Sequence, residues 1–249
     1  MLLDNKVAVI YGAGGAIGGA VARAFAREGA TVFLAGRTKA KLDTVASDIH
    51  AQGGTTEATV VDALDEQAVD AYVDSVAMQA GHIDISFNVI GVGDVQKPLP
   101  EISVEDFLQP ITNAMRTQFL TTRAAARHMV QRGLGVILTF GGGGPQTLPG
   151  LGGFKIALDA IEGLRRQWAV ELGPHGIRVV TLKTGGIPES IPVTDPEREE
   201  IIASLLPSTL LRRTATLADV GNVAAWVASD QARTLTSTEV NISCGAIVD

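Results

Sequence analysis

A glycine-rich segment near the N-terminus constrains this chain more than any other feature. Five glycines lie within residues 12–19, between the apolar run 7–11 and the amphipathic stretch 20–29. This order predicts a strand, a loop with little side-chain bulk, and a helix. Such a loop lets a pyrophosphate approach the backbone, while the free N–H groups and positive dipole end of the helix face the phosphates. The segment therefore predicts a dinucleotide site formed by Gly12, Gly14, Gly15, Ala16, Ile17 and Gly18.

Apolar, strand-like runs alternate with helical patterns along the whole chain, which is typical of repeated βα units. Strands are expected at 7–11, 31–35, 55–61, 83–88, 135–140, 177–182 and 239–243. Right-handed crossovers between parallel strands place helices on both faces of such a sheet. No linker or repeat divides the 249 residues. The prediction is an α/β fold with a single doubly wound, Rossmann-type domain over 1–249 and a seven-stranded parallel sheet.

The helical patterns fall between these strands. They cover 38–52, 65–81, 103–114, 115–132, 153–172 and 217–229. The third and fourth patterns are compatible with one helix bent near Pro110. The fifth is expected to bury Ile156, Leu158, Ile161, Leu164 and Trp168.

A proline-containing segment, 185–211, is predicted to be irregular, and residues 186–211 are predicted to form a substrate lid. Its apolar residues favour a small, apolar substrate. They are equally compatible with the inner face of a short helix packed on the domain.

Charge and cysteine content exclude several classes of function. The net charge is −7 and the pI is about 5.1, which argues against a nucleic-acid partner. The single cysteine, Cys244, cannot form an internal disulfide and is too little for a thiolate metal site. No apolar run approaches the ~20 residues of a membrane helix, and the first residues do not resemble a secretory signal. We therefore expect a cytoplasmic protein without membrane contact.

The ends of the predicted strands carry small or polar residues. Ligands bind doubly wound sheets at the carboxyl ends of the strands, near the switch in strand order. Six such positions here are rich in glycine or polar side chains, at 12, 36–37, 62, 88–91, 141–144 and 184–186. Their agreement is stronger support for a ligand site than any one glycine motif.

With these residues in place, the chain resembles the short-chain dehydrogenase/reductase family over essentially its whole length. Residues 11–18 resemble the family's Thr-Gly-x-x-x-Gly-x-Gly loop, with Tyr11 for the Thr and Ala16 for the middle Gly. Residues 88–91 resemble its Asn-Asn-Ala-Gly turn, and Lys155 resembles the lysine of its catalytic helix. The stretches 168–172 and 176–179 resemble the approach to its sixth strand.

This resemblance implies an oxidoreductase that binds a nicotinamide coenzyme and assembles as a homodimer or homotetramer. It implies an adenine contact at Asp62 and a ribose contact at Lys155. The cofactor contacts that it implies beyond the glycine loop are Asp62, Ala63, Asn88, Gly91, Lys155, Gly185 and Ile187.

The end of the second strand bears on the choice between NAD and NADP. An acidic residue there would bind the ribose 2′-hydroxyl and repel a 2′-phosphate. This chain instead has Gly36, followed by Arg37, Thr38 and Lys39. A guanidinium matches a phosphate group, whereas a merely solvated cation at a helix start is unfavourable for the helix dipole. We therefore expect NADP rather than NAD, held in part by Arg37 and Thr38.

The catalytic residues implied by the resemblance are largely missing. The family uses a Ser, a Tyr and a Lys, with an Asn behind them. The corresponding positions hold Gly142, Leu151, Lys155 and Ala114, and Asn113 is adjacent to the last. Leucine and glycine cannot donate a proton, and loss of general acid catalysis costs about 10²–10⁴-fold in rate.

Two hypotheses follow. The first is an NADP-dependent oxidoreductase with a non-standard active site, reducing an activated double bond or imine, in which Lys155 binds ribose or donates a proton. Gln146 and Thr147 are further candidates to orient the substrate. The second is a catalytically silent NADP(H)-binding pseudoenzyme that acts as a sensor or oligomer partner.

Overall fold

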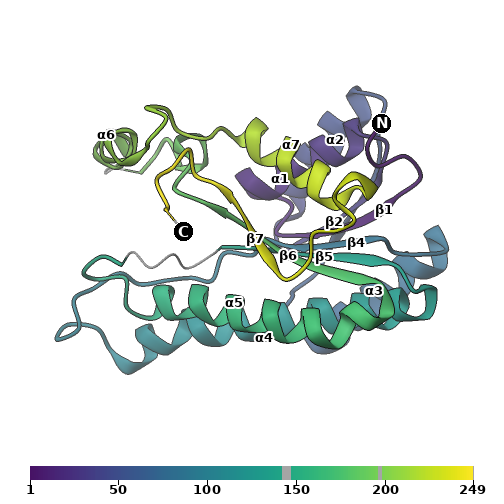
Figure 1. Ribbon diagram of the computed structural model, residues 1–249, viewed down its shortest axis with the longest axis horizontal. Helices are drawn as coiled ribbons and strands as arrows, with labels where there is room; N and C mark the ends of the chain where they lie inside the picture. The colour runs from purple at the N-terminus through teal and green to yellow at the C-terminus, as the bar shows by residue number, and fades with distance from the viewer. Residues whose placement is uncertain (142–146, 196–197, 249) are drawn as a thin grey trace.

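The predicted strands assemble into one parallel sheet. The computed structural model describes residues 1–141, 147–195 and 198–248, and these form seven strands in the order β3-β2-β1-β4-β5-β6-β7 (Figure 1). The strands are β1 (Val7–Tyr11), β2 (Thr31–Gly36), β3 (Thr55–Val60), β4 (Ile85–Asn88), β5 (Gly135–Phe140), β6 (Ile177–Thr184) and β7 (Thr238–Ile242). This confirms the predicted α/β fold with a seven-stranded parallel sheet.

Helices cover both faces of the sheet. They are α1 (Ala16–Arg27), α2 (Lys39–Ala51), α3 (Glu66–Ala80), α4 (Val104–Arg132), α5 (Gly152–Leu172), α6 (Arg198–Ser208) and α7 (Leu217–Ala228). Helices α1, α2 and α7 lie on one side, whereas α3, α4 and α5 lie on the other (Figure 1). The layered arrangement is that of a doubly wound domain.

Side chains of β1 supply both halves of the core, because alternate residues of a strand point to opposite faces. All of β1 is buried. Ala8 and Ile10 pack with residues of α1, α2 and α7, whereas Val7, Val9 and Tyr11 pack with residues of α3, α4 and α5. The strand order reverses between β1 and β4. This switch point opens a crevice at the carboxyl ends of the central strands.

Two helix predictions need correction. The segment 185–211 is not irregular throughout, since α6 occupies Arg198–Ser208. Its prolines do not prevent this, because Pro192 precedes the helix and Pro207 is its second-last residue. In α5, Ile156 is not inward but 46% exposed. Small residues, Gly153 and Ala157, occupy the buried stripe at that end of α5 instead.

The long patterns at 103–114 and 115–132 form one helix, α4, with Pro110 inside it. Across the part of the chain that the structure covers, no helix combines the length and apolar character needed to cross a membrane.

A buried carboxylate, Asp84, joins the amino ends of two strands to α4. Its Oδ2 accepts a hydrogen bond from the Val7 N–H at 2.8 Å and lies 3.0 Å from His82 Nε2. Its Oδ1 accepts from Arg132 Nη1 at 3.0 Å. Substitution Asp84→Ala leaves the Val7 donor without a partner, so we expect the free energy of unfolding to fall by about 1–3 kcal/mol. Urea denaturation measures this.

The matched control is Asp43→Ala on the exposed face of α2, where Lys39 is the one cation among the described residues that pairs with the carboxylate. We expect that change to cost about 0–1 kcal/mol. Equal losses in the two variants would show that burial of Asp84 adds nothing.

Candidate functional site

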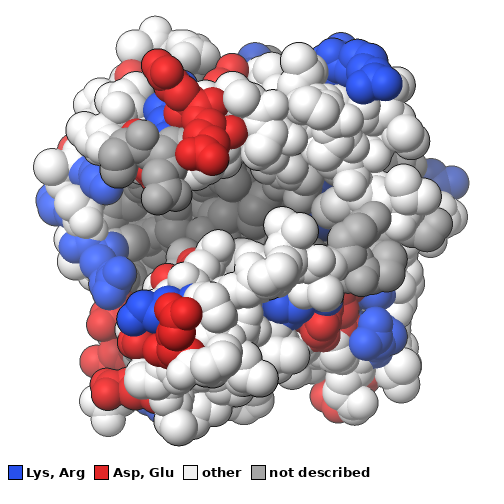
Figure 2. Space-filling view, turned by 90° about the vertical axis from the view of Figure 1, so that its left-hand side faces the viewer, with Lys and Arg blue, Asp and Glu red and all other residues white. Residues whose placement is uncertain are grey.

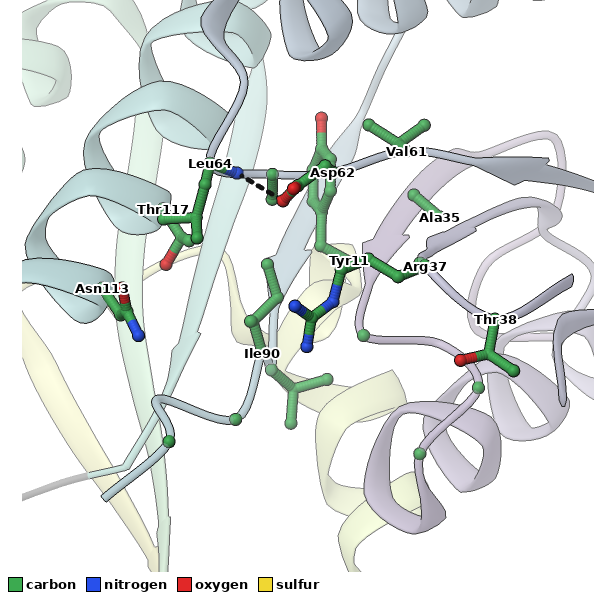
Figure 3. Close-up of a pocket in the computed structure, with 18 of the residues that line it drawn as sticks. Tyr11, Ala35, Arg37, Thr38, Val61, Asp62, Leu64, Ile90, Asn113 and Thr117 are labelled. Atoms are coloured by element: carbon green, nitrogen blue, oxygen red, sulfur yellow. Dashed lines mark hydrogen bonds between the residues drawn. The ribbon is translucent and has the colours of Figure 1, made fainter. Parts of the chain in front are cut away.

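A pocket of about 460 Å³ lies at the carboxyl ends of β1, β2, β3 and β4 (Figure 3). Its lining combines the glycine loop, the end of β2, the segments after β3 and β4, and one face of α4. The residues that line this pocket include Tyr11, Gly12, Gly14, Gly15, Gly36, Arg37, Thr38, Lys41, Asp62, Ala63, Leu64, Ile90, Gly91, Gln109, Asn113 and Thr117. This is the crevice that the strand order predicts.

Gly12 fixes the course of the glycine loop. It has φ +77°, and an added Cβ would lie 2.6 Å from the Val89 carbonyl oxygen. The N–H groups of Gly12 and Ala13 donate to the Ala35 carbonyl at 3.0 and 3.2 Å. The loop therefore lies flat against β2 and β4, with bare backbone facing the pocket.

The second half of the loop is the start of α1. Gly12, Gly14 and Gly15 line the pocket, whereas Ala16, Ile17 and Gly18 form the first turn of the helix. Gly15 is the N-cap, makes no side-chain cap hydrogen bond, and is followed by no acidic residue in the first turn. Neither the cap nor the first turn of α1 thus supplies an anion, which suits this helix N-terminus to a phosphate.

Positive charge gathers where β2 ends. Arg37 and Lys41 are exposed and line the pocket, and Figure 3 shows the Arg37 side chain directed into it. Among the described residues, no carboxylate forms an ion pair with either cation. Lys39 between them is paired with Asp43. Gly36 supplies no acidic group at the strand end, so this corner of the pocket can accept an anion.

Asp62 and Ala63 line the opposite wall. The Asp62 carboxylate accepts a hydrogen bond from the Leu64 N–H at 3.0 Å, which closes a tight turn after β3 (Figure 3). The turn holds the carboxylate at the pocket surface. Asp62 thus lies at the pocket surface, and its contact with adenine stays a prediction.

Asn88 and Gly91 differ in their placement. Gly91 lines the pocket. Asn88 is 3% exposed and lies behind it, where its amide donates to Thr121 Oγ1 at 3.0 Å and its carbonyl oxygen accepts from the Ile90 N–H at 3.1 Å. Both hydrogen bonds hold the turn after β4 against α4. Asn88 thus shapes the pocket from outside its lining.

Helix α4 contributes three polar residues that the sequence did not single out as cofactor contacts. Gln109, Asn113 and Thr117 line the pocket at intervals of four, which is one face of a helix. Ala114 instead points into a small cluster with Ala157 and Ile161. The polar side chain available near this position is that of Asn113, whose amide donates to the Val92 carbonyl at 3.0 Å.

Lys155 lies in the first turn of α5, outside the lining of the pocket. Its Nζ is 2.5 and 2.7 Å from the two carboxylate oxygens of Asp159, one turn further along. Leu151 is the N-cap of this helix. Gly142 and Gln146 fall outside the residues that the structure describes. Gly185 and Ile187 follow β6, and Ile187 is buried in the core beside α7.

The two tyrosines of the chain cannot replace the missing phenol. Tyr11 and Tyr72 are buried, with ring centroids 6.1 Å apart and an edge-to-face arrangement. Burial raises the pKa of both hydroxyls well above the ordinary value. Neither hydroxyl has a hydrogen-bond partner among the described residues. Within those same residues, no group of His, Cys, Asp and Glu side chains is arranged to hold a metal ion.

Comparison with known proteins defines the class. The family model described as enoyl-(acyl carrier protein) reductase matches residues 12–246. That span covers the glycine loop, the pocket lining except Tyr11, and all later strands. The chain belongs to the short-chain dehydrogenase/reductase family.

Individual relatives match at low identity over nearly their full length. An uncharacterized oxidoreductase from Methylorubrum extorquens is 32% identical over 249 residues, which is 98% of each chain. Oxidoreductase asL5 from Sarocladium schorii is 30% identical over 98% of this chain and 96% of its own. A solved dehydrogenase/reductase from Sinorhizobium meliloti superposes with a TM-score of 0.87 at 28% identity, covering 98% of this chain and 96% of its own.

Proposed function

We propose that this protein is an NADP-dependent oxidoreductase with a non-standard active site. The observation that carries the proposal is the pairing of an uncapped α1 N-terminus with two cations, Arg37 and Lys41, in one pocket. The helix N-terminus suits a pyrophosphate, and the two cations suit a 2′-phosphate. Both phosphate groups occur together in NADP. When bound, this coenzyme supplies a hydride.

The proposed coenzyme contacts lie in the pocket lining, on the first turns of α1 and α5, and in the segment after β6. The backbone of Gly12, Gly14 and Gly15 faces the pyrophosphate, with Ala16, Ile17 and Gly18 behind it. Arg37 and Thr38 bind the 2′-phosphate, and Asp62 with Ala63 contacts the adenine. Lys155, Gly185 and Ile187 lie toward the nicotinamide half, where Lys155 exchanges its bond with Asp159 for the ribose hydroxyls.

The reaction we infer is reduction of a double bond conjugated to a carbonyl, or of an imine. Leu151 stands at the position of the family's phenol and Gly142 at that of its hydroxyl. The site therefore lacks both groups that would normally donate a hydrogen bond to a ketone oxygen. An activated alkene or an iminium ion accepts hydride at carbon with less help from an acid. The description of the matching family model, an enoyl reductase, supports this class of substrate.

The lid is part of the same proposal. Figure 2 shows the face of the molecule beside α6 hollowed across its middle. Around this end, several leucines and valines are strongly exposed: Leu99, Leu148, Val193, Leu206, Leu210 and Leu211. Residues 186–211 would close over an apolar substrate, because covering such side chains is favourable. Exposed apolar side chains on α4 and α5, including Phe119 and Val170, likewise support a homodimer or homotetramer.

The alternative is a silent NADP(H)-binding protein, favoured by Gly142 and Leu151 alone. The deciding experiment follows NADPH consumption by the purified protein with enals, enones, quinones, imines and simple ketones. We expect turnover with enals, enones or imines and at least tenfold less with matched saturated ketones. If no compound of the panel oxidises NADPH although NADPH binds, the oxidoreductase proposal fails and the silent binder stands.

A further inference from the structure

The polar face of α4 forms one wall of the pocket, and none of the coenzyme contacts proposed above uses it. Gln109, Asn113 and Thr117 line this wall one turn apart. Gln109 is exposed, Asn113 is half-buried and Thr117 is buried. Figure 3 shows Asn113 and Thr117 on one side of the pocket and Thr38 on the other. The wall therefore lies at the end of the pocket away from the start of α2.

A hydrogen bond fixes the orientation of the Asn113 amide. Its Nδ2 donates to the Val92 carbonyl at 3.0 Å. A backbone carbonyl can only accept, so the amino end of the amide lies on this side and the carbonyl end is turned away from it. Across the described part of the chain, no group donates to Asn113 Oδ1. The pocket wall thus contains a half-buried acceptor that is available to a ligand.

Two contacts hold this part of α4 against the segments that follow β3 and β4. Arg116 Nε donates to the Leu64 carbonyl at 2.7 Å, which joins α4 to the turn that contains Asp62. The bond from Asn113 to Val92 joins α4 to the segment after β4. Asn113 therefore lies in a corner of the pocket, between these two segments, and protein contacts alone define its position.

One region of the pocket remains for the base of NADP. In the proposed function, the pyrophosphate lies at the α1 N-terminus and the 2′-phosphate at Arg37, and the base is attached to the ribose between them. The rest of the lining includes the turn after β3, Ile90 and the α4 wall. Leu64 and Ile90 offer apolar surface to the faces of a ring, whereas Asp62 and Asn113 offer oxygen acceptors to its edge. These acceptors suit the 6-amino group, which is the hydrogen-bond donor of adenine.

We propose that Asn113 determines specificity for the adenine base, with its Oδ1 accepting a hydrogen bond from the 6-amino group. This inference depends on the proposed function. Hypoxanthine carries an oxygen in place of that amino group, so it would set an acceptor against an acceptor and leave both unpaired. The α4 wall selects the coenzyme by its base, whereas Arg37 selects it by its ribose phosphate.

The probe is the reduced hypoxanthine analogue of NADPH, which differs from NADPH only in the base. Calorimetric titration gives the two dissociation constants and their ratio. We expect the wild-type protein to bind NADPH at least about tenfold more tightly than the analogue. Asn113→Leu keeps the size of the side chain and removes the acceptor. It should reduce the ratio at least about threefold, because NADPH loses a hydrogen bond and the analogue loses an unfavourable contact.

Thr112→Leu is the matched control. Thr112 precedes Asn113 on α4, is exposed, and is absent from the described lining of the pocket. We expect this variant to keep the wild-type ratio. The ratio also separates recognition of the base from a purely structural role of Asn113, since loosening of the segment at Val92 would weaken both ligands alike.

The wild-type comparison already tests the inference without any variant. Equal affinity of the wild-type protein for NADPH and the analogue overturns the role of Asn113 and leaves the proposed function intact. An unchanged ratio in Asn113→Leu overturns it as well. If the leucine variant does not fold, Asn113→Ala takes its place, because alanine adds no bulk and favours the helix. If neither ligand binds, the proposed function fails and the role of Asn113 fails with it.

Discussion

Replacing Arg37 with alanine weakens NADPH binding about ten- to a hundredfold and leaves NADH binding nearly unchanged. The guanidinium lies at the end of β2, lines the pocket, and forms no ion pair with a described carboxylate, so it is available to a ligand phosphate. A hydrogen bond to a charged group contributes roughly 1.5–3 kcal/mol, which gives the expected ratio. Isothermal titration with both coenzymes measures the effect.

Lys39→Ala is the matched control for this change. Lys39 carries the same charge two residues away but is paired with Asp43 and lies outside the pocket lining. We expect it to alter NADPH affinity by less than about threefold, because the charge of an exposed pair is largely screened. Equal loss of NADPH and NADH affinity in Arg37→Ala would contradict a 2′-phosphate contact.

Replacing Gly15 with aspartate should weaken coenzyme binding strongly without destabilising the fold. Gly15 is the N-cap of α1, with φ −81° and ψ 167°, a conformation that aspartate adopts readily. A carboxylate there stabilises the helix N-terminus by about 0.3–1 kcal/mol. It also occupies the anion site and repels a phosphate by about 4 kcal/mol at 4 Å and an effective permittivity of about 20. We expect both NADPH and NADH to bind at least about a hundredfold more weakly.

Gly15→Asn separates charge from size in that experiment. An added Cβ would lie 3.3 Å from the Gly12 carbonyl oxygen, and this close contact is the same for both substitutions. We expect the neutral variant to keep much more coenzyme affinity than Gly15→Asp, with similar melting temperatures for both. Wild-type affinity in Gly15→Asp would show that the pyrophosphate does not lie at the α1 N-terminus.

The glycine loop, Arg37 and Asp62 could be predicted because each follows directly on a strand. Strand ends of a parallel sheet meet at one edge, so residue type and spacing are enough to place these side chains together. The pocket residues of α4 depend on finer geometry. A rotation of one residue about the helix axis decides whether Asn113 or Ala114 faces the pocket, and sequence periodicity does not define that rotation so closely.

The ion-pair cluster of Glu162, Arg165, Lys183 and Glu239 could not be predicted for a related reason. Glu162 and Arg165 are spaced like an ordinary surface pair on a helix. Lys183 and Glu239 meet only through the pairing of β6 with β7. One signal in the sequence is Lys183, a cation within a mostly apolar strand, which indicates that a buried partner is needed. The identity of that partner depends on the register of β6 against β7, which the sequence does not define.

We propose above all that NADP binds with its phosphates against the backbone of the β1–α1 crossover. The most direct measurement is calorimetric titration of the wild-type protein with NADPH and, separately, with NADH. We expect a stoichiometry of one per chain and at least about tenfold tighter binding of NADPH. Tighter binding of NADH, or no binding of either coenzyme at millimolar concentration, would contradict it.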